Sequence, residues 1–169
     1  KYFKFDVYAK DQTYGQENTG RSSGSFDGTM KNTWQKATIG GHKYLFVNFD
    51  YLANAAMIKK LNDFIALDEN KDYKVIMNTH IYLTAGTSNK NFIPQFAASN
   101  KYSKVQNPAF FKDGGKYLWD NLFNLHKNIV MVLCGHSSSN GIEYTSKKGK
   151  YGNTVNAFLI DPQGMDLYN

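Results

Sequence analysis

Apolar and polar positions alternate with a period of two in the early patterned parts of the chain. Residues 2–8 and 42–50 alternate in this way, which is typical of strands with one buried face, and residues 33–39 are a further expected strand. Gly40 and Gly41 separate residues 33–39 from 42–50, and a two-glycine turn between two expected strands predicts a β-hairpin.

The period then changes to that of an amphipathic helix. Apolar residues recur at helical spacing over 54–68, with Asn54 as the N-cap, and again over 115–126. Each helical stretch precedes a short and almost continuous apolar run, at 73–80 and at 128–136. Runs of this length and composition predict buried strands.

Alternating strands complete the pattern at 141–146, 153–160 and 164–168. Residues 11–32 and 84–112 show no periodicity and are predicted to be long loops, and a connection as long as the second is often functional. The order of elements predicts an α/β (α+β) fold, in which a mixed β-sheet carries helices on one face.

The amino-acid composition indicates that the chain can form a hydrophobic core of its own. It has 169 residues, of which 41% are hydrophobic and 15% aromatic, so a single ordered domain is expected rather than a disordered segment. No uninterrupted apolar run approaches the roughly 20 residues that span a bilayer, so we expect no transmembrane segment. The single cysteine, Cys134, excludes an internal disulfide and a multi-cysteine zinc site.

The charge is positive but spread out. The net charge is +6, and Arg21 is the only arginine among the 20 basic residues. Arginine is the usual residue for bidentate recognition of bases and phosphates, and the lysines form no continuous stripe, so nucleic-acid binding is disfavoured. We interpret the charge as a source of solubility and of mild attraction for anions.

Two of the four histidines occupy positions that suggest chemistry. His42, near the hairpin turn, and His126, at a helix end, have ordinary structural explanations. His80 and His136 each directly follow an apolar strand, and ligands of open α/β sheets collect at the carboxyl ends of strands. Because both strands follow helices, we expect them to run parallel as neighbours. Their tips then lie roughly 5 Å apart, or about 10 Å with one strand between them.

Two imidazoles at such a separation can share a metal centre, since imidazole is a common ligand of zinc and iron. Gly135, directly before His136, allows a sharp turn or a close approach of the backbone. The alternative is that both histidines are simply polar residues at the ends of strands, and the sequence pattern leaves both possibilities open.

Two short motifs around these histidines resemble those of a known family. Residues 78–83, NTHIYL, resemble the fourth motif of calcineurin-like metallophosphoesterases, and Cys134-Gly135-His136 resembles the start of the fifth, Gly-His-x-His. The resemblance covers roughly residues 33–169 and includes the order of the helices and strands around both motifs. It implies that the predicted sheet and helices are half of a four-layer αββα sandwich.

The resemblance also implies a reaction. The family hydrolyses phosphate mono- or diesters at a centre of two divalent metal ions such as manganese, iron or zinc, which lower the pKa of bound water and stabilise the developing charge. His80 and His136 would both bind the second metal. The last histidine of the fifth motif is replaced by Ser138, so the first metal is expected to be weak, altered or missing.

Three further motifs of the family are absent from the chain. They are Asp-x-His, Gly-Asp-x-x-Asp and Gly-Asn-His, and they supply the bridging carboxylate and most of the other ligands. We therefore expect this chain to be the C-terminal half of the enzyme, with those motifs upstream of Lys1, and to be inactive alone. The partner expected on its open sheet face is the missing half or a second copy. The alternative function is a non-catalytic binding or interaction domain derived from this fold.

Overall fold

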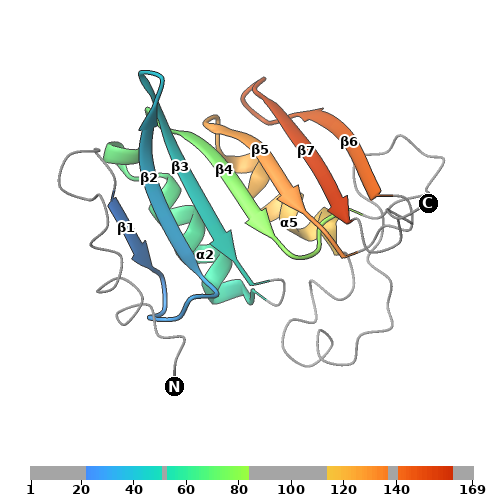
Figure 1. Ribbon diagram of the computed structural model, residues 1–169, viewed down its shortest axis with the longest axis horizontal. Helices are drawn as coiled ribbons and strands as arrows, with labels where there is room; N and C mark the ends of the chain where they lie inside the picture. The colour runs from blue at the N-terminus through green and yellow to red at the C-terminus, as the bar shows by residue number, and fades with distance from the viewer. Residues whose placement is uncertain (1–21, 51–52, 84–113, 137–140, 162–169) are drawn as a thin grey trace, which may run out of the picture.

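The computed structural model describes residues 22–50, 53–83, 114–136 and 141–161. Within them the chain forms one seven-stranded sheet in the order β1-β2-β3-β4-β5-β7-β6, with two α-helices behind it in the view of Figure 1. The strands are β1 (Ser22–Ser25), β2 (Thr33–Ile39), β3 (His42–Phe49), β4 (Lys74–Thr79), β5 (Ile129–Cys134), β6 (Gly141–Lys148) and β7 (Thr154–Asp161). The helices are α2 (Ala55–Ile65), α5 (Gly115–Asn121) and the short 3₁₀ turns η1 (Asp68–Asn70) and η2 (Phe123–Leu125).

The predicted hairpin is confirmed. Strands β2 and β3 are antiparallel, and Ile39 pairs with His42 across the two-residue turn. Gly40 and Gly41 have φ values of 57° and 79°, a left-handed geometry that glycine adopts at little cost and that matches the twist of a tight hairpin.

The centre of the sheet is parallel. Strands β3, β4, β5 and β7 are successive parallel neighbours, and their arrows point the same way in Figure 1. Helix α2 lies between β3 and β4 in the chain, and α5 lies between β4 and β5. Each of these two crossovers returns the chain to the edge of the sheet where the preceding strand began. Because the four strands are parallel, their carboxyl ends lie at one edge of the sheet.

Helix α2 begins where the sequence predicts and ends three residues earlier. The Asn54 side chain accepts a hydrogen bond from the Met57 N–H at 2.9 Å, which confirms the predicted N-cap. The helix ends at Ile65 rather than at about Asp68, because the chain there enters η1. Its buried face consists of Ile58, Leu61 and Ile65.

The second predicted helix, 115–126, is broken into α5 and η2. The backbone of Leu122 leaves helical geometry at φ −143° and ψ −68°. Leu122 and Phe123 are both fully buried, whereas an unbroken helix would direct consecutive side chains about 100° apart. The break lets both side chains reach the core.

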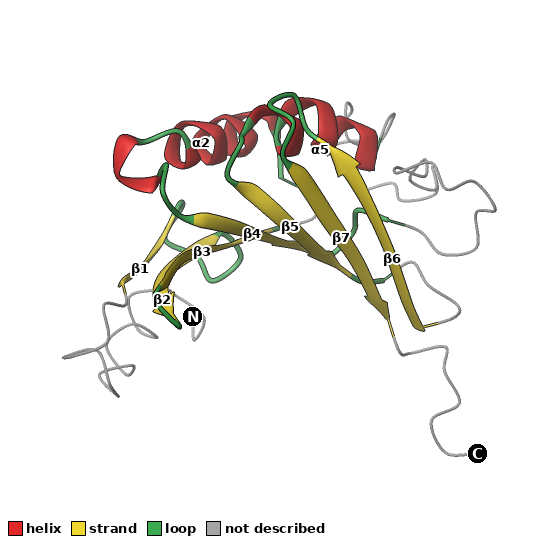
Figure 2. Ribbon diagram, turned by 90° about the horizontal axis from the view of Figure 1, so that it is seen from above, coloured by secondary structure: helices red, strands yellow, loops and turns green. Residues whose placement is uncertain are grey.

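Both helices lie on the same face of the sheet, as predicted and as Figure 2 shows. The core fills the space between them and the sheet, and its largest fully buried side chains include Leu45, Leu61, Met77, Leu118, Phe123 and Leu159. We call the opposite side of the sheet the open face, because no described helix or strand covers it. The side chains of alternate residues that face it include Tyr44, Phe46, Ile76, Leu133, Tyr144, Phe158 and Ile160.

The prediction of a loop over residues 11–32 is wrong in part. Residues 22–25, inside the expected loop 11–32, form the edge strand β1, which pairs with β2 through backbone bonds. A short edge strand needs only a free neighbouring edge and no apolar alternation, so a small polar segment such as SSGS gives no signal in the sequence. The expected strands 2–8 and 164–168, the loop 84–112 and residues 11–21 lie outside the described residues.

In the part of the chain that the structure describes, neither helix has the length or apolar character that crossing a bilayer would require.

His126 has the structural role that its position suggests. Its Nε2 lies 2.7 Å from Oδ1 of Asn62 on α2, and the Asn62 amide in turn donates to the carbonyls of Ile58 and Asn121. Because the Asn62 oxygen can only accept, the histidine donates this bond. Burial lowers the pKa of His126 below its usual range, so the folded protein holds the ring neutral.

The stability of the protein should therefore fall as this histidine is forced to take a proton. Below about pH 6.5 the unfolded chain binds a proton at His126 that the folded chain resists, so stability decreases from there down to the lowered folded pKa. In His126→Gln the urea midpoint should fall less between pH 7.5 and pH 5.5 than in the wild type. His42→Gln, the same substitution at an exposed histidine, is the matched control. Equal pH dependence in His126→Gln and the wild type would contradict the buried, neutral histidine.

Candidate functional site

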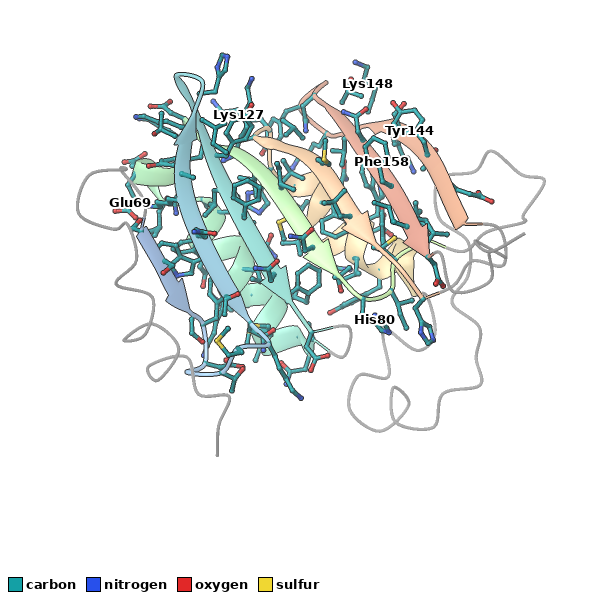
Figure 3. All side chains as sticks on the ribbon, viewed as in Figure 1. Glu69, His80, Lys127, Tyr144, Lys148 and Phe158 are labelled. Carbon is teal, nitrogen blue, oxygen red and sulfur yellow. The ribbon has the colours of Figure 1, made fainter. Side chains whose placement is uncertain are left out.

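His80 comes directly after β4, at the carboxyl edge of the sheet. Val75, Met77 and Thr79 are buried on the helix side of β4, so the alternate residues Ile76 and Asn78 face the open side. The strand ends at Thr79, and the exposed His80 is labelled in Figure 3 beyond the ends of the strands. An apolar strand with a polar tip thus delivers an imidazole to the edge of the sheet.

His136 reaches the same edge from β5. Gly135 follows the strand, and a Cβ atom on it would lie 3.1 Å from the carbonyl oxygen of Ile160, a tight contact that glycine avoids. His136 then adopts φ 70°, and it is the one non-glycine residue with positive φ among the described residues. Left-handed backbone in a residue with a side chain is strained, and such strain often accompanies functional sites.

The structure brings these two histidines together. The Gly135 N–H donates to the His80 carbonyl at 3.0 Å, which extends the parallel pairing of β4 and β5 beyond the strands. The ring centroids of His80 and His136 are 4.6 Å apart, with an angle of 50° between the rings. The prediction that both histidines follow neighbouring parallel strands is confirmed. We call them the histidine pair.

A shallow cavity of about 410 Å³ opens beside His80. Its lining includes Lys31, Asn48, Asn78 and Thr79, together with residues from the ends of β5 and β7. Asn78 donates to the Asn48 oxygen at 2.8 Å, and Asn48 donates to the Thr33 hydroxyl at 3.2 Å. This row of hydrogen bonds crosses three strands and fixes the polar side chains on the open face next to the histidine pair.

Cys134 also borders this cavity but is a poor candidate for chemistry. Its side chain is buried, and burial raises the pKa of the thiol to about 11. Backbone N–H groups of Leu83 and Tyr82 lower the pKa only in part. At neutral pH the group is a thiol, and only the thiolate is a strong nucleophile or metal ligand.

The histidine pair is not a complete metal site by itself. Among the described residues, no cluster of three or more histidine, cysteine, aspartate or glutamate side chains could hold a metal ion. Ser138, at the expected position of a further ligand, lies outside the described residues. No family model, no curated protein and no solved structure matches the chain.

Two polar residues at this edge, Asn48 and Lys31, are not among the residues predicted from the sequence to form a site. Asn48 precedes the end of β3, and Lys31 approaches from the turn before β2, where it pairs with Asp50 at 3.5 Å. Asn48 follows from placing β3 parallel to β4, since it is the polar open-face residue nearest the end of an adjoining strand. Lys31 is brought here by pairing of β2 with β3, which gives no local signal in the sequence.

The strained backbone at His136 predicts an unusual order of stabilities. Alanine keeps the Cβ that disfavours positive φ, whereas glycine removes it, so His136→Gly should be more stable to urea than His136→Ala by about 1 kcal/mol. The same two substitutions at His80, where φ is not positive, should give the opposite order. If alanine were the more stable variant at both positions, the left-handed geometry of His136 would be wrong.

Proposed function

We propose that this chain supplies His80 and His136 as two ligands of a divalent metal ion in a calcineurin-like metallophosphoesterase. The observation that carries the proposal is the separation of 4.6 Å between the two ring centroids at adjoining strand ends. The motifs NTHIYL and Cys-Gly-His stand at those ends. On this proposal the chain is the C-terminal portion of an enzyme that hydrolyses phosphate mono- or diesters.

The geometry of the histidine pair fits a single shared ion. Two imidazoles that bind one zinc ion at about 2.1 Å, at roughly tetrahedral angles, have ring centroids about 5 Å apart. The observed separation is close to this value, and both side chains are exposed at the edge of the sheet. Manganese, iron and zinc all accept imidazole ligands, so the pair does not select among them.

When bound, a pair of divalent ions in such an enzyme lowers the pKa of water and polarises a phosphate ester. The residues of this chain would hold one of the ions and shape its surroundings. The parallel strands and the hydrogen bond from the Gly135 N–H to the His80 carbonyl hold the two histidine backbones side by side. Asn78 and Asn48, anchored to each other, offer polar groups on the open face beside the ion.

The histidine pair leaves most of a two-metal centre to be supplied from elsewhere. Two imidazoles cannot hold two ions, and no bridging carboxylate stands with them among the described residues. The remaining ligands would come from a segment that carries the Asp-x-His, Gly-Asp-x-x-Asp and Gly-Asn-His motifs. Alone, the 169-residue chain should bind one ion and hydrolyse nothing.

The open face is where such a segment would pack. It carries aromatic and aliphatic side chains from β3 to β6, and Tyr144 and Phe158, labelled in Figure 3, lie with ring centroids 5.0 Å apart. Tyr144 and Ile160 are 59% and 49% exposed. Exposed apolar patches on a sheet favour a covering layer, which on this proposal is a second sheet from the other half of the enzyme or from another copy of the chain.

A non-catalytic binding domain of the same fold is the second candidate. The observation that favours it is the absence of any three-ligand cluster within the described residues. Such a domain would use the open face to hold a partner and would have no need of the histidine pair. The two candidates therefore differ in whether the chain binds a metal through His80 and His136.

The metal part of the proposal predicts stoichiometric binding. In isothermal titration calorimetry, the 169-residue chain should bind one Zn²⁺ per molecule. His80→Ala and His136→Ala should each weaken binding at least about tenfold, because loss of even an outer partner of a ligand costs about 10- to 100-fold. His42→Ala, at an exposed histidine near the hairpin turn, serves as the matched control and should bind like the wild type.

A hydrolysis assay on the same samples tests whether the chain alone lacks a complete two-metal centre. With Mn²⁺ or Zn²⁺ the chain should release no measurable product from an aryl phosphate. Zinc binding that persists in His80→Ala and His136→Ala would contradict the metal site and favour the binding domain. Turnover by the chain alone that disappears in His80→Ala would show that the centre is complete without further segments.

A further inference from the structure

A second cavity lies at the amino edge of the sheet, at the opposite end of β4 and β5 from the histidine pair. It has a volume of about 390 Å³, and its lining includes Ile65, Lys71, Leu125, Lys127 and Tyr151. We call it the amino-edge cavity. Figure 3 labels Lys127 at this end of the sheet and His80 at the other.

The charged side chains in the lining of this cavity are basic. Lys71 and Lys127 come from the turns that lead into β4 and β5, and no aspartate or glutamate is among the described residues of the lining. A third lysine, Lys150, lies 5.7 Å above the Tyr151 ring at the rim. Lys127 forms no ion pair with any described residue. Two lysines therefore line the cavity, and a third lies beside Tyr151, one of its lining residues.

Lys71 pairs with Asp68, and this ion pair neutralises the lysine only weakly. Asp68 is 3.9 Å from the Lys71 ammonium, at the limit of an ion pair, and its side chain is 99% exposed, so water and salt screen the contact. His126 also borders the cavity, but its Nε2 is bonded to Asn62 and the ring is neutral in the folded protein. The charged groups that line the cavity are therefore two lysines with little neutralisation by described acidic residues.

The remaining lining is apolar and aromatic. Ile65, Ala66 and Leu125 form hydrocarbon walls, and Tyr151 presents a ring that is 59% exposed. The cavity is of the size that small-molecule sites have, with mostly apolar walls and a few polar groups that fix orientation. A flat apolar body against Leu125 and Tyr151 would leave an attached anion within reach of the lysines.

We propose that the amino-edge cavity binds a small organic anion, an aromatic or aliphatic group that bears a phosphate or carboxylate. Lys71 and Lys127 pair with the anionic group, and Tyr151 and Leu125 contact the apolar part. The site is separate from the histidine pair, requires no metal ion, and stands whether or not the chain belongs to a phosphoesterase.

The test uses phenyl phosphate as the probe and the whole 169-residue chain in the presence of EDTA. Binding is followed through backbone amide resonances, and those of Ala66, Leu125, Asn128 and Tyr151 should shift in a saturable way. Benzyl alcohol, which keeps the ring but carries no charge, should shift them far less. Raising the salt concentration should weaken the binding of phenyl phosphate.

Substitutions locate the site and separate it from the histidine pair. Lys71→Met and Lys127→Met keep the apolar stem of lysine, and each should weaken binding about threefold, with roughly tenfold for the double variant. Lys59→Met on the exposed face of α2 and His80→Ala should both bind like the wild type. Absence of saturable shifts, equal binding of benzyl alcohol, or equal weakening by Lys59→Met would overturn the proposal. Shifts centred on His80 that vanish in His80→Ala would also overturn it.

Discussion

The parallel pairing of β4 with β5 is the constraint on which the rest of the candidate site depends. Parallel strands can be neighbours only if a crossover returns the chain to the same edge, and here the segment that contains α5 makes that return. The pairing continues past the strands in the bond from the Gly135 N–H to the His80 carbonyl, which holds the two histidine backbones side by side. An antiparallel arrangement, or a strand inserted between them, would place the imidazoles at different edges or beyond the reach of one ion.

The regular part of the fold follows from the sequence because it depends on local signals. The hairpin is marked by Gly40 and Gly41, and helix α2 is marked by the Asn54 cap and a clear apolar stripe. The central strands are apolar runs that follow helices, which is enough to expect parallel neighbours and hence adjacent histidines. What could not be predicted depends on distant contacts. Strand β1 forms because β2 offers a free edge, and α5 ends early because Leu122 and Phe123 must both enter the core.

The two ends of the parallel strands have different chemistry. The carboxyl edge gathers imidazoles and anchored amides, whereas the amino edge gathers lysines around an apolar cavity. A net charge of +6 could not distinguish these regions, because the lysines of the amino edge come from turns that are far apart in the chain. The open face borders the carboxyl edge, where Asn48 and Asn78 face it, whereas the amino-edge cavity is lined by residues from the ends of α2 and η2 and from turns.

The most direct test of this account is the proximity of the two histidine rings in solution. In a uniformly ¹³C- and ¹⁵N-labelled chain, we expect a nuclear Overhauser cross-peak between the ring protons of His80 and His136, and none between those of His80 and His42. Backbone cross-peaks between β4 and β5 serve as the internal reference for strand pairing. Absence of the cross-peak between the rings of His80 and His136, with the backbone cross-peaks present, would contradict the metal-ligand geometry on which the proposed function rests.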